Sequence, residues 1–352
     1  MDHSHTVALR RCSDDESIAR AVTLLAEDTA FLLRDNLRIV IKPNLNDLSG
    51  PYSGFTTDVR VVDALVKYIN AHSHPDQIYI VESDSWNRLA GEAFEQLGYT
   101  EIASAQKNVK LVNLTKTSGI NVELPIPSFY DVIRIPRLFL DANLFISVAK
   151  LRTHHTVISG ILKNQFGCIP RRFKGRYHAY LNDILPSLNL LMRPDWSLVD
   201  GIIGRDVRPR ELDLLLASHD PVAADSVSAR IMGFDPRRIP HISRAAAKSV
   251  GTMDPESVLL DGKPVTNLDS IISPKFIGPS PLGLRLTNLG LALTRTTNRS
   301  KGIGDFFVKI GALWTGASQY SKKEILEKLR AYGMVKAVYD SLQVGGGRRD
   351  EV

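Results

Sequence analysis

Charged residues follow several apolar runs of this chain, and each run has the composition of a buried β-strand. The first four pairs of run and charged residue are 37–41 with Lys42, 77–81 with Glu82, 144–149 with Lys150, and 196–199 with Asp200. A fifth run, 212–218, ends at His219 and Asp220. Parallel α/β sheets bind ligands outside the carboxyl ends of their strands, so we expect these charged residues to converge on one crevice. Such a set predicts a polar site for a charged substrate, with or without a metal ion.

The segment 150–167 holds the densest set of candidate residues. We expect a loop over 152–155 and then a helix that begins near Thr156. On that helix, Gly160 and Lys163 would lie opposite the apolar face, beside Asn164. Backbone N–H groups at a helix start favour anions. The basic residues that could surround a carboxylate or phosphate are Lys150, Arg152, His154, His155 and Lys163. A solvent-facing basic loop is the structural alternative.

A second candidate segment, 42–46, runs from a strand end into a turn with one proline and two asparagines. Lys42 emerges from an apolar strand, which predicts a ligand contact. Asn44 and Asn46 either contact the ligand or hydrogen-bond their own backbone as turn residues. The candidate catalytic residues are therefore Lys42, Lys150, His154, His155 and Lys163, and the candidate substrate-binding residues are Asn44, Asn46, Arg152 and Asn164.

Three acidic residues form a candidate metal site. Glu82 and Asp200 end strands, and Asp225 lies in a predicted helix of small and apolar residues. Carboxylates from several elements commonly hold Mg²⁺ or Mn²⁺, with water completing the shell. Two alternatives stay open: the carboxylates pair with the lysines and tune their pKa values, and Asp225 is a first-turn acid that stabilises its helix. For Asp220, which Pro221 follows, the sequence favours a helix N-cap.

Composition restricts the class of protein. The 352 residues are 43% hydrophobic and 23% charged, as in ordinary globular proteins, and no apolar run is long enough to cross a membrane. We see no signal peptide, and two isolated cysteines predict a reducing, cytoplasmic location and no iron–sulfur cluster. No nicotinamide or flavin motif occurs. The net charge of +6 fits an anionic ligand or a solvated basic surface, and missing arginine–aromatic interleaving argues against nucleic acid.

Strand and helix patterns alternate along most of the chain. This alternation, with strands that are apolar on both faces, predicts an α/β fold: a three-layer, mostly parallel sheet with helices on both faces. We expect this core domain over 1–273. Proline, glycine, threonine and arginine predict a linker over 274–300, followed by a helical extension over 301–344 and a disordered tail over 345–352.

Taken together, these motifs resemble the DUF362 family, which is named for having no assigned function. The residues that carry the resemblance are 41–44, 150–154, 160–167, 200–201, 217–225 and 233–236. The resemblance covers roughly 35–250 and implies a shared core and site, but it supplies no reaction. The chain differs from members with a ferredoxin-type cluster. The family is expected to have a loop that contains glycine and glutamate after Asp200. The segment 204–209 stands in its place, which implies a variant substrate.

The leading hypothesis is an enzyme that acts on a small anionic metabolite, either a carboxylate or a phosphate ester. Lys42, Lys150 and Lys163 would stabilise negative charge, and His154 or His155 would serve as general acid or base. Proton transfer of a lyase, isomerase or hydrolase type fits best, because no redox cofactor motif occurs. The alternative is a non-catalytic binding or scaffold protein that docks a partner through its basic C-terminal extension. A homo-oligomer is compatible with both hypotheses.

Overall fold

The computed structural model describes residues 5–86, 88–124, 132–154, 156–272 and 275–278. The predicted linker, helical extension and tail therefore lie outside the described residues, apart from 275–278. Among the candidate site residues, His155 is outside the described part, and only the backbone of His154 is inside it.

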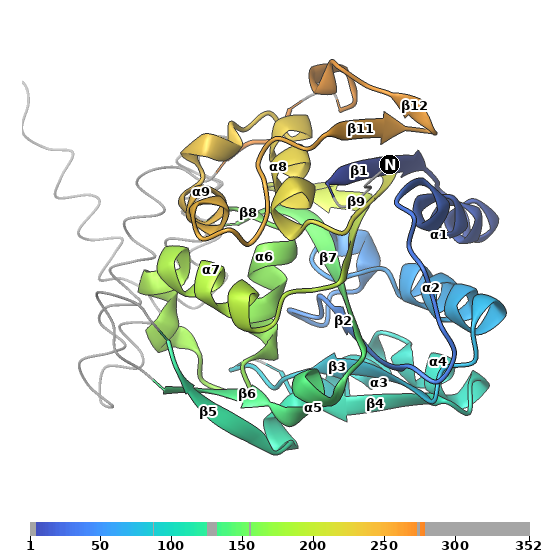
Figure 1. The fold of residues 1–352 in the computed structure, drawn as a ribbon, viewed down its shortest axis with the longest axis vertical. Helices are drawn as coiled ribbons and strands as arrows, with labels where there is room; N and C mark the ends of the chain where they lie inside the picture. The colour runs from blue at the N-terminus through green and yellow to red at the C-terminus, as the bar shows by residue number, and fades with distance from the viewer. Residues whose placement is uncertain (1–4, 87, 125–131, 155, 273–274, 279–352) are drawn as a thin grey trace, which may run out of the picture. The chain divides into compact units, whose positions relative to one another are not determined.

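One large sheet forms the centre of the described core (Figure 1). Its parallel part consists of β2 (Arg38–Pro43), β3 (Gln77–Glu82), β4 (Val109–Asn113), β7 (Leu144–His154) and β9 (Trp196–Arg205). Its other strands are β1 (Thr6–Arg11), β8 (Val157–Ser159), β10 (Pro209–Ser218), β11 (Ser257–Leu260) and β12 (Lys263–Pro264). The spatial order is β12-β11-β1-β10-β9-β7-β2-β3-β4, and β8 pairs with β7. A separate antiparallel pair consists of β5 (Gly119–Glu123) and β6 (Val132–Pro136).

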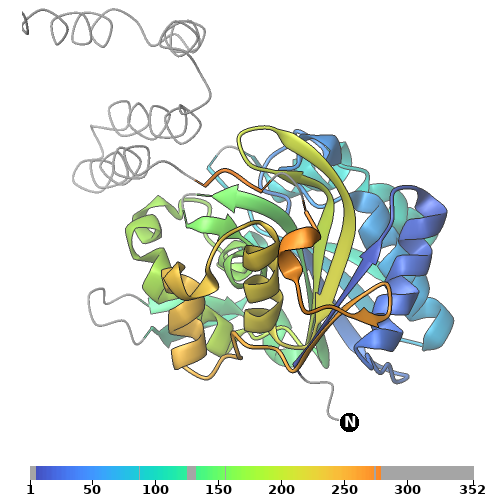
Figure 2. The same ribbon diagram turned by 90° about the horizontal axis from the view of Figure 1, so that it is seen from above.

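Helices cover both faces of this sheet (Figures 1 and 2). One face carries α1 (Asp15–Asp28), α2 (Val59–His72), α3 (Ala90–Gln96) and α4 (Tyr99–Ala105). The other carries α6 (Ile161–Asn164), α7 (Leu181–Leu191), α8 (Pro221–Ile231) and α9 (Pro240–Ala247), and the short α5 (Arg137–Asp141) follows β6. Because both faces are covered, Ile39, Val40 and Ile41 of β2 are fully buried. The predicted α/β fold is confirmed.

The helix next to the site begins and packs as its sequence predicts. The Asp58 side chain caps α2 by accepting a hydrogen bond from Arg60 N at 3.0 Å. One apolar stripe of this helix is buried against the sheet, and its members are Val61, Val62, Leu65, Val66 and Ile69. By contrast, no element was predicted over 168–195, and this segment contains α7.

The strand direction of β10 corrects one expectation. β10 runs antiparallel to β9, with Ser218 opposite Ser197, so Asp220 lies at the end of the sheet where β9 begins. The expected convergence of Asp220 with the other charged strand ends is therefore wrong. Its predicted role as N-cap is confirmed, since Asp220 Oδ1 accepts hydrogen bonds from Val222 N at 2.8 Å and Ala223 N at 2.9 Å.

The segment after Lys150 also differs from the prediction. β7 continues to His154 and turns back into β8, with Arg152 opposite Ser159. The expected loop over 152–155 and the helix from Thr156 are therefore wrong. The β-branched pair at 157–158 suits a strand, and the helix is only the short α6 that follows Gly160.

Candidate functional site

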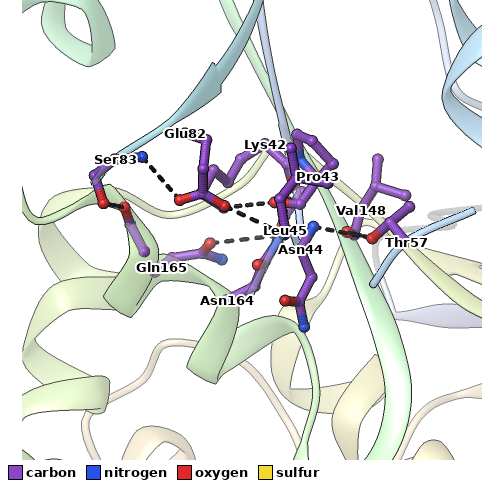
Figure 3. Close-up of polar contacts among 12 residues, drawn as sticks. Lys42, Pro43, Asn44, Leu45, Thr57, Glu82, Ser83, Val148, Asn164 and Gln165 are labelled. Atoms are coloured by element: carbon purple, nitrogen blue, oxygen red, sulfur yellow. Dashed lines mark hydrogen bonds and ion pairs between the residues drawn. The ribbon is translucent and has the colours of Figure 1, made fainter. Parts of the chain in front are cut away.

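The charged ends of β2 and β3 form a buried ion pair (Figure 3). Lys42 Nζ lies 2.9 Å from Glu82 Oε2, and the side chains are 1% and 3% exposed. The same carboxylate accepts hydrogen bonds from Leu45 N at 3.2 Å and Ser83 N at 2.8 Å, and Arg88 Nη2 lies 3.2 Å away. Burial alone would raise the pKa of Glu82, but Lys42 and Arg88 more than offset this and lower it. The carboxylate therefore stays ionised.

β7 and β9 carry a second ion pair. Lys150 and Asp200 are register partners, their Nζ and Oδ2 atoms lie 2.8 Å apart, and neither side chain is exposed. Asp200 also accepts hydrogen bonds from Asp58 N at 2.7 Å and Ile202 N at 3.0 Å. In both pairs a carboxylate neutralises a lysine, which is one of the two alternatives to a metal site. The ammonium groups of Lys42 and Lys150 are therefore buried and ion-paired, and neither is exposed to solvent.

The three acidic residues proposed as metal ligands do not come together. Glu82 and Asp200 each face a lysine, whereas Asp225 on α8 faces α6. Among the described residues, no three side chains of His, Cys, Asp or Glu are grouped as a metal site needs. Binding of Mg²⁺ or Mn²⁺ has no ready donor set in this part of the chain and stays a prediction.

Lys163 on α6 differs from the other two lysines. Its side chain is partly buried, and no carboxylate of the described residues pairs with it; its nearest ring is Phe166, 6.0 Å from Nζ to centroid. Burial, and then the positive charges of Arg152 and Lys42, lower the pKa of Lys163 to about 7. An amine with such a pKa is present in both protonation states near neutral pH, which suits a general acid or base.

Arg152 on β7 is a second cation with no ion pair in the described part of the chain. Its side chain is buried, and Nε has no hydrogen-bond partner there. The guanidinium lies over the Phe55 ring, with Cζ 5.3 Å from the centroid. Burial is the main reason why its pKa falls to about 10. A buried guanidinium without an ion pair is costly, and the negative charge of Asp47 offsets only part of that cost.

The candidate asparagines have different surroundings. Asn164 Nδ2 donates to Lys42 O at 2.9 Å and to Ser147 Oγ at 3.0 Å, which ties α6 to the ends of β2 and β7. The backbone N–H of Asn44 donates to Thr57 Oγ1 at 2.9 Å. Asn46 is exposed. Asn164 and the Asn44 backbone therefore position the charged residues. Contact between a ligand and any of the three asparagines stays a prediction.

Comparison with known proteins places the chain in a family. Residues 39–230, more than half of the chain, match the family described as domain of unknown function (DUF362). The chain belongs to this family. The range that matches DUF362 contains all of the candidate site residues, from Lys42 to Asp225. The resemblance read from the motifs is thus confirmed.

Two further proteins are similar to this DUF362 member. A thylakoid-associated protein of Synechocystis sp. is 28% identical over 230 residues, which cover 61% of this chain and 68% of that protein. The lactate racemase apoprotein from Thermoanaerobacterium thermosaccharolyticum has a TM-score of 0.35 and 12% identity, and the match covers 66% of this chain and 58% of that one. A likeness at that TM-score carries no argument about activity. None of the described helices is long and apolar enough to cross a membrane, and the cytoplasmic location stays a prediction.

Within the DUF362 range, Asp225 has a role that the sequence did not reveal. Its Oδ1 and Oδ2 accept hydrogen bonds from Ile161 N at 2.6 Å and Leu162 N at 3.0 Å. Asp225 therefore caps α6, which carries Lys163, from the neighbouring α8. Burial, only partly opposed by these two hydrogen bonds, raises the pKa of Asp225 to about 7. Asp225 thus holds the start of the helix that carries Lys163.

Gly160 allows this contact, and its replacement gives a first prediction. A Cβ atom at Gly160 would lie 2.0 Å from Asp225 Oδ1. We expect Gly160→Ala to lower the free energy of unfolding by about 1–3 kcal/mol, because the buried carboxylate has to move. Gly91→Ala in α3 is the matched control, since a Cβ there meets nothing within 4 Å, and it should leave stability unchanged or higher. Urea denaturation of both variants measures the difference; an unaffected Gly160→Ala would contradict the tight contact.

Lys174 was not among the predicted site residues, but it contributes to the same end of the sheet. Its Nζ donates to Ser83 Oγ at 2.7 Å and to Asp84 O at 2.9 Å, next to the Lys42–Glu82 pair. Burial lowers its pKa to about 8. The basic run 171–176 was the available signal, but only the folded path of the chain distinguishes this buried lysine from its exposed neighbours Arg171 and Arg172.

Proposed function

We propose that this protein is an enzyme that binds a small anion at the carboxyl ends of β2 and β7 and transfers a proton through Lys163. The observation that carries the proposal is the environment of Lys163. Its ammonium group lies near two other cations, Arg152 and Lys42, and no carboxylate of the described residues neutralises it. Lys163 would be the acid–base group, and Arg152 would bind the anion.

Charge balance supports an anionic substrate. Glu82 and Asp200 are already held by Lys42 and Lys150, so neither carboxylate remains for Arg152 or Lys163. Enclosing unpaired charge costs stability, and a bound anion removes that cost. Arg152 and Lys163 are nevertheless both present without an ion pair, which is typical of a ligand-binding site.

The pKa of Lys163 supports proton transfer. A general base works best when its pKa lies near the working pH, and Lys163 meets this condition at about 7. Lys42 and Lys150, each neutralised by a carboxylate, would instead hold the strand ends in place around Lys163. The reaction would be of the lyase, isomerase or hydrolase type, with His154 and His155 as candidates for a second acid–base group.

The test uses small carboxylates and phosphate esters in D₂O, followed by proton NMR, with the full-length protein and its Lys163→Met variant. We expect loss of a C–H signal or formation of a product with the wild-type protein, and roughly 100-fold slower change or none with Lys163→Met. Lys67→Met is the matched control, because Lys67 lies on the surface in an ion pair with Asp63. A Lys163→Met protein that reacts at the wild-type rate would exclude Lys163 as the acid–base group. If no anion binds or reacts, the scaffold hypothesis replaces the enzyme.

A further inference from the structure

The loop after β2 holds Phe55 between two arginines. Arg152 Cζ lies 5.3 Å from the ring centroid of Phe55, and Arg205 Cζ lies 4.0 Å from it. Arg205 comes from the end of β9 and donates through Nη1 to Ser53 O at 2.7 Å. The ring and both guanidinium groups are therefore fixed by strands and loop together.

The loop that carries Phe55 is tightly packed. A Cβ atom at Gly54 would lie 2.7 Å from Gly204 O, and Gly54 has a φ of +70°. The loop thus packs directly on the backbone of β9, and Phe55 is held next to Arg152. A guanidinium that rests on a ring keeps its N–H groups directed outward in its own plane. Arg152 is consequently oriented before any ligand arrives.

At least one N–H group of Arg152 is not satisfied by the described part of the protein. Its Nε is buried and has no partner among the described residues, and no carboxylate there forms an ion pair with the guanidinium. Arg205 differs, because its guanidinium already binds backbone carbonyls at Ser53 and Val207. Of the two arginines on Phe55, Arg152 is the one suited to an incoming anion.

We propose that Arg152 binds the carboxylate of a small monocarboxylic acid through two parallel N–H···O hydrogen bonds, with the transferable proton of that acid facing Lys163. This inference rests on the proposed function and names its substrate class. The planar fork of a guanidinium matches the two oxygens of a carboxylate.

Charge favours a carboxylate over a phosphate ester. A monoanion cancels the single charge of Arg152 and leaves the neighbouring Lys163 free to lose its proton. A phosphate dianion would leave net negative charge beside Lys163 and hold its ammonium protonated. In the step itself, the neutral amine of Lys163 takes the proton, and the electron pair of the broken bond stays on the substrate.

The experiment is isothermal titration calorimetry of the full-length protein with three probes of similar size: propionate, ethyl phosphate and propionamide. We expect propionate to bind most tightly, and Arg152→Lys to weaken it by roughly tenfold or more, because lysine keeps the charge but loses the paired geometry. Ethyl phosphate should bind more weakly than propionate to both proteins, and its affinity should also fall in the variant, because the guanidinium fork matches phosphate oxygens as well. Arg171→Lys is the matched control, since Arg171 is exposed on the surface.

Two contrary outcomes are distinguishable. If ethyl phosphate binds more tightly than propionate and Arg152→Lys leaves propionate unaffected, the carboxylate assignment is overturned, while an anion-binding enzyme stands. If none of the probes binds and the D₂O experiment also shows no reaction, both the substrate class and the proposed function fall. Circular dichroism of Arg152→Lys establishes that a loss of binding does not reflect loss of the fold.

Discussion

Lys163→Met is expected to make the protein more stable near neutral pH. The substitution replaces a partly buried ammonium, which no described carboxylate neutralises, with an apolar side chain of similar length. We expect the free energy of unfolding to rise by about 2–4 kcal/mol near pH 6, given that one pKa unit corresponds to ~1.4 kcal/mol and that solvent screens part of the effect. The same change should slow proton transfer by roughly 100-fold or more. A stabilising substitution that removes function is characteristic of a residue kept for its chemistry.

The pH dependence of this effect has a definite sign. The pKa of Lys163 falls from its ordinary 10.5 to about 7, chiefly because of burial. Between these values the unfolded chain binds more protons than the folded protein, so the stability of the wild type rises with pH. Below about pH 7 both states are protonated and the full penalty of burying the charge is present. Lys163→Met has no such group, so its advantage should shrink as the pH approaches about 10.

Urea denaturation at about pH 6, 8 and 10 measures both proteins in parallel. Lys174 titrates in the same direction, since its pKa is lowered to about 8, but it is present in both proteins and its contribution largely cancels in the difference. Lys67→Met serves as the control and should differ from the wild type by less than about 1 kcal/mol at every pH. An advantage of Lys163→Met that does not change with pH would contradict the lowered pKa of Lys163.

The sequence predicted the fold class because each parallel strand is a continuous apolar run. Each of the runs that end at Lys42, Glu82, Lys150 and Asp200 forms a strand of the parallel part of the sheet. The run before Asp220 has the same composition but the opposite direction. Direction depends on the length and path of the connection, and β9 and β10 are joined by a short hairpin. The composition of a strand therefore does not determine its direction.

The sequence predicted which charged residues follow the parallel strands, but it did not predict how they pair. Residues at strand ends meet if their strands are neighbours, and the order β9-β7-β2-β3 makes Lys150 face Asp200 and Lys42 face Glu82. A single sequence does not contain this order. Lys163 stands apart because no carboxylate of the described residues pairs with it. Its isolation arises from Asp225, which binds the backbone of α6 instead of a lysine, a contact between residues more than sixty positions apart.

Asp200→Asn should cause the second large effect, a loss of about 3–5 kcal/mol in the free energy of unfolding. Removing one partner of a fully buried ion pair leaves the other charge unpaired, and the Lys150 side chain has no exposed surface. The backbone N–H groups of Asp58 and Ile202 donate to different oxygens of Asp200, so one of the two also loses its acceptor, because an amide has only one oxygen.

A double-mutant cycle separates the two causes of this loss. Lys150→Met removes the cation, so Lys150→Met/Asp200→Asn should recover about 2 kcal/mol or more relative to Asp200→Asn alone. The remainder reflects the lost backbone acceptor. Asp63→Asn is the matched control, because the Asp63–Lys67 pair lies on the surface and should cost less than about 1 kcal/mol. If the double variant is no more stable than Asp200→Asn, the ammonium of Lys150 is not what the carboxylate neutralises, and the second ion pair loses its assigned role.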